Sequence, residues 1–440
     1  MGDKEKKKQV KKDKNPDRKA AYLLIAPSLL LILVIAIYPV IQSFYFSLFD
    51  LRLNSPTKSS VHLDYSINLD TYLQYYPFLV DDLDSTIEDT SGPVKEGLTD
   101  VKEDLESLDQ NIQEDTGKTY EEVNNILNNF ETPSSELAMV DITNETADQF
   151  EETIKEINTA LTQLKGTDEI ENFSEIQGLA SGLQGAIIEP NFIGFQHYQN
   201  QLTDPRMWSS LWTTVYFTII SVAIEFVLGL AIALLINKAF FGRGLIRATV
   251  LIPWAIPTAV SAMMWKFLYD GQNGIVSKFF MELGIIDSMS TLLSTNFGAM
   301  SSVILSEVWK TTPYIALLLL AGLQVIPKSL YEAASIDGAG KWKQFIHITM
   351  PMLRLSILVA VLFRTLDAFR VFDLIYVLTG GGPANSTETI SILAYKVMFA
   401  QTNFGAGSAL AVIVFICVAI ISMIFVKVLG SDLLPENQGK

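Results

Sequence analysis

Charged side chains inside apolar segments are the residues of this sequence whose types and spacing could do chemistry. Glu225 interrupts one long uncharged run, and Glu307 and Lys310 interrupt another. Four charges of alternating sign then recur every three residues from Arg364 to Asp373. An ionisable group within a membrane-spanning helix costs about 2.5–3.5 kcal/mol on insertion scales, so each needs a partner or a function. We therefore expect either ion pairing or a polar path for a solute.

Helix geometry separates these charges by depth and direction. Arg364 and Asp367 lie deep in their segment, and Glu225 lies at a depth close to that of Arg364. Since the series winds half-way round a helix, Arg364 and Asp373 should point in opposite directions. Two interpretations stay open: a ladder paired with itself along one helix, or a substrate path or gate. An ion pair between Glu225 and Arg364 is a specific prediction.

Aromatic side chains at comparable depths could stack on a solute, although packing is their more common role in such segments. They are Trp309, Tyr314, Phe369 and Phe372.

Other chemistries find little support in the residues. One cysteine, Cys417, and three scattered histidines offer little for a metal site. The stretch "TGKTY" ends like part of a phosphate-binding loop, but position 112 is Ile where such a loop needs Gly. We expect no catalytic residue, no metal site, no cofactor held by this chain and no nucleic-acid partner.

Apolar segments long enough to cross a membrane, about 20 residues each, must position these charges. The first 19 residues hold nine basic side chains, which places this tail in the cytoplasm by the positive-inside rule. Basic connections after the second, fourth and sixth segments fall on the same side, so the tail 431–440 is cytoplasmic too. A cleaved signal peptide is the alternative for the first segment, but its 30 residues are too many. The predicted spans are residues 20–49, 209–237, 248–265, 299–326, 355–378 and 397–426.

An acidic block, residues 50–190, separates the first two spans on the extracytoplasmic side. Its residues 50–189 hold 31 acidic and 7 basic side chains in a chain whose net charge is -16. Apolar residues in it recur at alternating spacings of three and four, which favours amphipathic helices folded into an antiparallel bundle. Partly frayed helices on a flexible arm are the alternative. The two series are Val94, Leu98, Val101, Leu105, Leu108 and Ile112, then Ile154, Ile157, Leu161 and Leu164.

The stretch "EAASIDGAGKWKQFIHITMP", residues 332–351, is a polar connection between the fourth and fifth spans. Ser329 and Glu332 have the spacing of a capping box, which predicts a short helix from about Leu330. Asp337 and Gly338 should end it in a sharp turn. A second amphipathic helix follows, with Trp342, Phe345 and Ile348 three residues apart, and Pro351 suits the first turn of the next span.

This stretch resembles the EAA loop of permease subunits of binding-protein-dependent ABC importers. The likeness extends over residues 191–430, and "FDLIYVLTGGGPANSTET" is similar to the carbohydrate branch. Leu355 departs from the pattern, since many members have a second Pro there. The positions that match the loop, residues 328–351, are Glu332, Ala333, Ala334, Asp337, Gly338, Ala339, Phe345, Ile348 and Pro351.

The resemblance implies an all-α, polytopic membrane protein with six transmembrane helices, the type I importer fold and an inserted extracytoplasmic helical or coiled-coil domain. It implies a subunit that passes a sugar or oligosaccharide across a bacterial cell membrane. Its partners would be a second permease in a heterodimer, two ATPase subunits that bind ATP and Mg²⁺, and an extracytoplasmic solute-binding protein. In maltose-type members an extra extracytoplasmic domain touches that binding protein.

In that family the EAA loop docks on the ATPase. The resemblance implies that Glu332 pairs with a basic group there and that Gly338 sets the angle between the two short helices. The alternative is that the apolar residues of the loop rest on the membrane surface.

Other function classes remain as rivals. The chain could import a non-sugar solute, or be a membrane sensor with a coiled-coil ectodomain, although we expect the tail to be too short for an output domain. A secondary transporter would favour internal repeats, and none is evident.

Overall fold

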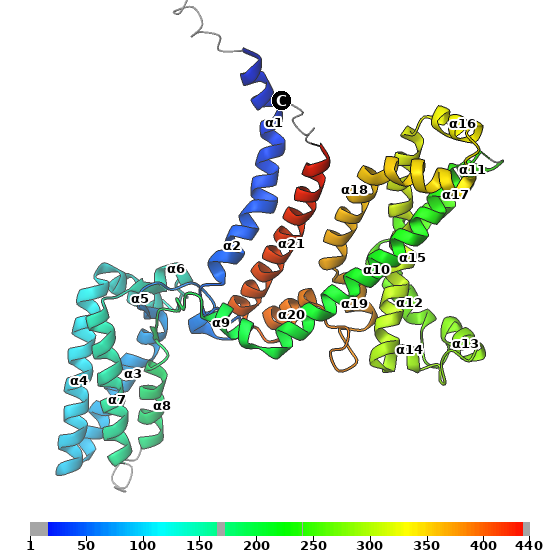
Figure 1. Cartoon of the computed structure of the whole chain (residues 1–440). Coiled ribbons are helices and arrows are strands. Elements are labelled where there is room, and N and C mark those ends of the chain that lie inside the picture. Colours follow the sequence, from blue (N-terminus) through cyan, green and yellow to red (C-terminus); the bar gives the residue numbers. More distant parts are fainter. Residues whose placement is uncertain (1–15, 165–171, 240, 434–440) are drawn as a thin grey trace, which may run out of the picture. The chain divides into compact units, whose positions relative to one another are not determined.

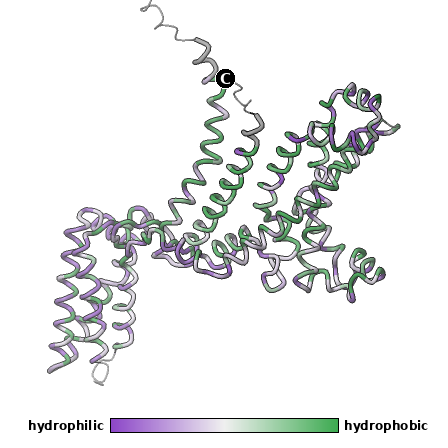
Figure 2. The backbone as a smooth tube through the Cα atoms, viewed as in Figure 1, coloured by the Kyte–Doolittle hydropathy of each residue, from purple (hydrophilic) through white to green (hydrophobic). Residues whose placement is uncertain are grey.

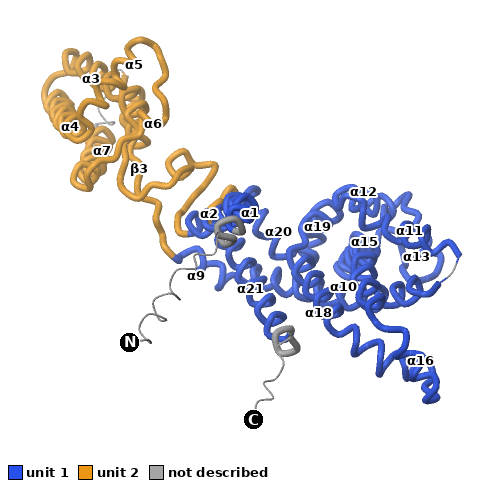
Figure 3. Tube along the Cα trace, turned by 90° about the horizontal axis from the view of Figure 1, so that it is seen from above, with its two compact units in different colours: residues 1–47, 195–401, 406–440 blue, residues 48–194, 402–405 orange. Residues whose placement is uncertain are grey.

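The computed structural model describes residues 16–164, 172–239 and 241–433, which fall into two compact units. We call residues 48–194 with 402–405 the acidic unit, and the remaining described residues the apolar unit (Figure 3). Figure 2 shows hydrophobic residues in near-continuous runs along α21 (Phe404–Leu433), whereas they alternate with hydrophilic residues along α4 (Pro93–Thr116). The two units therefore differ as a membrane protein and a water-exposed bundle differ.

All regular elements among the described residues of the apolar unit are helices (Figure 1). Besides α21, its elements are α1 (Pro16–Ile32), η1 (Leu33–Ile37), α2 (Tyr38–Phe46), α9 (Gln196–Thr203), α10 (Pro205–Asn237), α11 (Arg243–Ala255), α12 (Thr258–Leu268), α13 (Ile275–Glu282), α14 (Thr291–Ser294), α15 (Asn296–Val325), α16 (Lys328–Ile336), α17 (Lys341–Gln344), η3 (Phe345–Thr349), α18 (Met350–Phe369), α19 (Asp373–Leu378), α20 (Ile390–Tyr395) and η4 (Lys396–Ala400).

Within the described residues, five helical stretches are long and apolar enough to cross a membrane, and a bent pair makes a sixth if it counts as one span. This agrees with the predicted all-α polytopic fold and moves several boundaries. The five stretches are Tyr22–Phe46, Pro205–Asn237, Asn296–Val325, Lys341–Phe369 and Phe404–Val428.

The third predicted span is not one straight helix. Its two halves, α11 and α12, meet at an angle of 89°. Pro257 explains the break: it has no N–H to continue the helix, and it keeps the preceding Ile256 extended at φ -72° and ψ 133°. Pro253 lies inside α11, where the helix continues past it.

The fifth and sixth predicted spans also break where the sequence predicts continuous helices. Helix α18 ends at Phe369, and Phe372 has a non-helical φ of -136° before α19 starts. Asp373 therefore belongs to another helix, and the prediction that it points opposite Arg364 on one helix is wrong. The residues expected to open the last span belong to η4, and Thr402 has φ +56° before α21 starts.

Helix α15 lies at the centre of the apolar unit and is buried along most of its length. Small residues bring its neighbours close. At Gly229 of α10, a Cβ atom would lie 2.7 Å from Cγ2 of Ile315, and at Gly322 of α15 it would meet the side chain of Ser356 on α18. These contacts bring the backbones of α10 and α18 against α15 and set which of their side chains meet.

The helices of the acidic unit pack around one hydrophobic core. The predicted series on α4 is buried at every position, and Ile154, Ile157 and Leu161 of α7 (Asn144–Leu164) are buried too; the side chain of Leu164 lies outside the described residues. Helices α4 and α7 run antiparallel, because Asn111 bonds Gln149 (3.0 Å) while Asp115 bonds the backbone of Thr143 (2.8 Å). The packed core favours the predicted bundle over a flexible arm.

Several elements of the acidic unit were not expected from the sequence. A three-stranded antiparallel sheet has the order β2 (Met139–Asp141), β1 (Ser66–Asn68), β3 (Ile187–Ile188), and the helices α3 (Leu69–Asp89) and α8 (Phe173–Leu183) complete the bundle. The remaining elements of the unit are η2 (Pro56–Lys58), α5 (Lys118–Asn128) and α6 (Ser135–Ala138). The "TGKTY" stretch forms the turn between α4 and α5 and the start of α5.

The chain enters and leaves the acidic unit at neighbouring positions. The N–H of Asp50 donates to the carbonyl of Asn191 at 2.8 Å, and that of Ile193 donates to Leu48 at 2.9 Å. The segment 402–405 joins them, since the N–H of Leu53 donates to the carbonyl of Thr402 at 2.9 Å. We call residues 48–53, 191–194 and 402–405 the base of the acidic unit.

Candidate functional site

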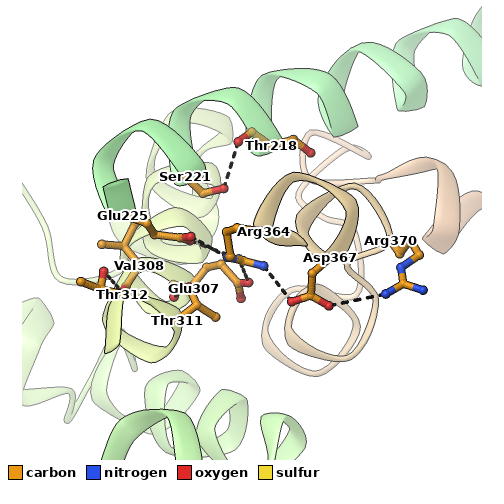
Figure 4. A network of polar contacts seen from close by, with 10 residues as sticks. All are labelled: Thr218, Ser221, Glu225, Glu307, Val308, Thr311, Thr312, Arg364, Asp367 and Arg370. Atoms are coloured by element: carbon orange, nitrogen blue, oxygen red, sulfur yellow. Dashed lines mark hydrogen bonds and ion pairs between the residues drawn. The ribbon is translucent and has the colours of Figure 1, made fainter. Parts of the chain in front are cut away.

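Arg364 of α18 is the centre of a buried charge cluster in the apolar unit (Figure 4). Its Nε donates to Oε2 of Glu225 at 2.5 Å, and its Nη2 donates to Oε1 at 3.1 Å. Nη2 also donates to Glu307, and Nη1 donates to Oδ2 of Asp367 at 2.8 Å. The predicted pair of Glu225 and Arg364 is confirmed, and it is part of a larger group.

Three helices supply this cluster. Glu225 comes from α10 and Glu307 from α15, and their carboxylates and the guanidinium of Arg364 are almost entirely buried. Because a buried charge is tolerated only with partners, these contacts fasten α10 and α18 to the central helix. Glu307 was expected to need a partner, but its place in this cluster was not predicted. The sequence feature that indicates such a contact is an acidic residue within an apolar span.

Lys310 lies three residues after Glu307 on α15 and is buried. Its Nζ donates to the carbonyl of Ile256 at 2.8 Å, the residue that follows α11 at the sharp bend. A cation at the carboxyl end of a helix is favourable for the helix dipole. Two buried carboxylates and the guanidinium carry one net negative charge, which Lys310 offsets nearby.

The outer part of the cluster is exposed. Asp367 accepts from Arg364 on the same helix and has Arg370 at 3.9 Å on its other side. The side chains of Asp367 and Arg370 are more than half exposed. The ladder interpretation is thus present from Arg364 to Arg370, beside the pairing between helices.

A cleft of about 250 Å³ opens next to the cluster. Carboxylates, cations, hydroxyls and aromatic rings line it together, so it offers both hydrogen-bonding groups and ring faces. Its walls include Glu307, Lys310, Asp367, Arg370 and Asp373, with Trp254, Thr258, Thr311 and Phe372.

The predicted aromatic residues separate in the structure. Phe372 lines the cleft, and Tyr314 stacks on Trp254 with ring centroids 5.7 Å apart. Trp309 packs edge to face on Trp265, and Phe369 is buried. Glu225 and Arg364 lie behind the wall of the cleft rather than on it, since neither lines it. Trp254, which is not among the predicted residues, lines the cleft.

The EAA loop forms two short helices joined by a turn. Helix α16 starts at Lys328 after Pro327, and no side chain caps its first N–H groups. The predicted capping box is therefore wrong: the helix begins two residues earlier than expected, so Ser329 lies inside the first turn. Glu332 and Ala333 are exposed, and Ala334 is half-buried.

Gly338 makes the turn that ends α16. At φ +77° its backbone lies in the left-handed region, which a residue with a side chain adopts only under strain. The N–H of Ala339 donates to the carbonyl of Ala334 at 2.8 Å. Gln344 fixes the turn by donating to Ser335 at 2.8 Å and to the carbonyl of Ala339 at 3.0 Å. The predicted stop at Asp337 and Gly338 is confirmed.

The second short helix continues without a break into the fifth span. Elements α17, η3 and α18 form one helical stretch, with Pro351 in the first turn of α18 as predicted. Trp342 is exposed and stacks on the half-buried Phe345, whereas Ile348 packs on the core of the apolar unit. Of the three apolar residues, Trp342 is therefore on the exposed face of the helix and Ile348 is on the face that packs against the core.

The sequence matches known transport proteins over the region that holds these sites. Residues 225–434 match the family described as binding-protein-dependent transport system inner membrane component. The trehalose/maltose transport system permease protein MalF of Thermococcus litoralis is 44% identical over 242 residues, which cover 55% of this chain and 81% of that protein.

This chain belongs to the family of binding-protein-dependent ABC importer permeases. Its relatives place it in the carbohydrate branch. Another is the sulfoquinovosyl glycerol transport system permease protein SmoG of Agrobacterium fabrum, 38% identical over 57% of this permease and 79% of that protein. The family consists of transport permeases rather than enzymes, and the permease is a multi-pass protein of the cell membrane.

A solved structure agrees with the permease fold. A bacterial ABC transporter involved in the import of the acidic polysaccharide alginate matches at a TM-score of 0.50 and 21% identity, over 55% of the permease and 85% of that chain. At this identity the likeness concerns the fold alone.

A second ion cluster in the permease was not predicted from the sequence. Glu388 is buried and accepts from Arg206 at 2.8 and 2.9 Å and from Lys396 at 2.7 Å. Burial acts to raise the pKa of Glu388, but the hydrogen bonds from Arg206 and Lys396 hold it below its usual value. These residues fasten the amino end of α10 to the start of α20. The signal was a single acidic residue just before an apolar helix.

Proposed function

We propose that this permease moves a sugar or short oligosaccharide into the cytoplasm as one subunit of an ATP-driven importer. It pairs with a second, different permease subunit, and two ATPase subunits bind ATP and Mg²⁺ and hydrolyse the nucleotide. An extracytoplasmic solute-binding protein delivers the solute. Both termini of the permease are cytoplasmic, in agreement with the basic residues that precede the first span.

The continuous helix from the EAA loop to the charge cluster carries this proposal. The run Lys341–Phe369 joins the turn at Gly338 directly to Arg364. A displacement of the loop by a docked ATPase would therefore act on the guanidinium that holds Glu225 and Glu307. The exposed Glu332 supplies a charge to a basic group of the ATPase.

The loop surface supports docking over rest on a membrane. Ile336 and Trp342 are exposed, and they lie among Lys341, Lys343 and Glu332. Aromatic and aliphatic anchors within a charged rim are characteristic of protein interfaces. A docked ATPase subunit would cover both.

The cleft beside the cluster serves as part of the substrate path. Trp254 and Phe372 offer ring faces to a sugar, while Asp367 and Thr311 accept or donate hydrogen bonds to hydroxyl groups. Arg364 acts behind this wall: by binding Asp367 it orients a carboxylate of the cleft.

The acidic unit lies outside the cytoplasm, where substrate arrives. Its residues 50–189 carry 31 acidic and 7 basic side chains, a charge that attracts a partner with a basic face. We propose that it engages the solute-binding protein. The alternative is a solvated spacer whose charge maintains solubility.

Transport by the whole complex in proteoliposomes tests this function. Uptake of labelled maltose should require ATP and the binding protein, and it should persist when ion gradients are collapsed. Uptake that follows an ion gradient without ATP would mean a secondary transporter. Binding of a ligand with no uptake under any condition would favour the sensor.

A further inference from the structure

The charges that face the cleft are unequally available to a solute. Three carboxylates line it, from Glu307, Asp367 and Asp373, against two cations, Lys310 and Arg370. Asp367 and Asp373 are exposed. Their availability depends on what already neutralises each group.

The cations of this site are engaged with the protein. Arg364 is buried and donates to three carboxylates. Lys310 is buried and donates to the carbonyl of Ile256 at 2.8 Å. Arg370 donates through Nε to Leu366 at 3.1 Å, and its Nη2 lies 3.9 Å from Asp367.

Asp373 differs from these groups. Among the described residues, no hydrogen bond or ion pair engages its carboxylate, which follows the break after α18 and opens the short helix α19. An anionic solute in the cleft would therefore meet the carboxylate of Asp373, and the carboxylates that line the cleft outnumber its cations by three to two. Repulsion between like charges disfavours such a solute, and an arranged repulsion is a common source of specificity.

We propose that the cleft selects uncharged glycosyl units and rejects sugars that carry a carboxylate or sulfonate, with Asp373 as the residue that enforces the choice. This inference rests on the proposed place of the cleft in the substrate path. The aromatic rings of Trp254 and Phe372 and the hydroxyls of Thr258 and Thr311 suit a neutral sugar ring. The relatives act on both classes by name, trehalose or maltose in one case and sulfoquinovosyl glycerol in another, so the family alone does not decide between them.

Equilibrium binding to the purified importer in nanodiscs, without the binding protein, isolates the contribution of the permease. The probes are maltose and a matched disaccharide in which one glucose ring is replaced by glucuronate. The wild type should bind maltose more tightly. In Asp373→Asn the ratio of the two dissociation constants should fall at least about ten-fold, and Asp373→Lys should lower it further. Asp287→Asn, at an exposed aspartate away from the cleft, should leave the ratio unchanged.

A second measurement needs no variant. Raising the salt concentration from about 0.05 to 0.5 M shortens the Debye length and should reduce the preference of the wild type for maltose. Equal affinity for both probes in the wild type, or a ratio that Asp373→Asn does not change, overturns the selection. If Trp254→Ala and Phe372→Ala leave the affinity for maltose unchanged, the cleft is not on the substrate path, and it is the proposed function of the cleft that fails.

Discussion

Arg364 on α18 donates two hydrogen bonds to the carboxylate of Glu225 on α10, from Nε to Oε2 at 2.5 Å and from Nη2 to Oε1 at 3.1 Å, and both side chains are buried. The same guanidinium also binds Glu307. The two carboxylates therefore depend on one cation, and the consequences of removing each member are unequal.

Arg364→Met should destabilise the permease more than Glu225→Gln. The first change leaves two buried carboxylates without their cation, a loss of about 3–5 kcal/mol, whereas the second leaves Arg364 bound to Glu307 and Asp367. Unfolding in mixed detergent micelles measures both. The exchange Glu225→Arg with Arg364→Glu should recover part of the loss through a coupling of about 0.5–3 kcal/mol. Recovery stays partial because Arg364→Glu sets a carboxylate beside Glu307, and strictly additive losses would contradict the pairing.

The turn of the EAA loop gives a second prediction. Gly338→Val should detach or uncouple the ATPase, because a β-branched residue at φ +77° is strained by about 1–2 kcal/mol. Gly338→Asn should retain more coupling, since Asn tolerates this conformation. Glu332→Lys should weaken ATPase binding through its charge. Copurification of the ATPase and ATP-driven uptake are the readouts.

Gly340 is the matched control for this turn. It has φ -67° and open space around the position of a Cβ atom, so Gly340→Ala should leave coupling intact. Undiminished copurification and uptake in Gly338→Val and Glu332→Lys would exclude the docking role of the loop.

The extent to which the sequence predicts this molecule depends on the range of the forces involved. Depth along a helix follows from a fixed rise per residue, so the meeting of Glu225 and Arg364 could be predicted. The rotation of α15 that adds Glu307 could not, because it is set by close packing at Gly229 and Gly322.

Helix breaks and short strands could not be predicted from the sequence in this way. The bend at Pro257 follows a known rule, but membrane helices often continue through proline, and only the packing decides. Strands of two or three residues, such as Ile187–Ile188, leave no periodic pattern to read. The heptad series on α4 is long, and its burial was predictable for that reason.

The ion cluster at the base of the acidic unit gives a pH prediction. Asp50 accepts from Lys58 at 2.7 Å and from Arg52 at 2.9 Å. Burial acts to raise the pKa of Asp50, but these hydrogen bonds hold it below its usual value. The stabilisation is therefore fully present above the unfolded pKa of about 3.9 and is lost as the pH falls through the lower folded value. Asp50→Asn should lower the unfolding midpoint at pH 7.

The difference between wild type and Asp50→Asn should shrink under acid conditions. Far-UV circular dichroism of thermal unfolding at neutral and acid pH measures it. Asp64→Asn, at an exposed position, serves as the control and should change the midpoint little at either pH. A difference that grows in acid would show that the ion pairs do not stabilise the base.

Excision of residues 56–189 tests the role of the acidic unit. With a flexible Gly/Ser bridge, the shortened permease should still copurify with the ATPase. The concentration of binding protein needed for half-maximal stimulation of ATP hydrolysis should rise and lose much of its salt dependence, because the removed charge acts over about 8 Å at physiological salt. An unchanged concentration and salt response would favour the solvated spacer.

The first and last residues of the acidic insertion lie next to each other, and this has a consequence for the evolution of the chain. Because Asp50 and Asn191 are hydrogen-bonded to each other at 2.8 Å, a single insertion into one short connection is enough to add the whole bundle, and a single deletion removes it. The match to the Thermococcus relative covers most of that protein but little more than half of this chain. A lineage of such importers can thus gain or lose this bundle in one step, without a change in the sequence of the membrane helices.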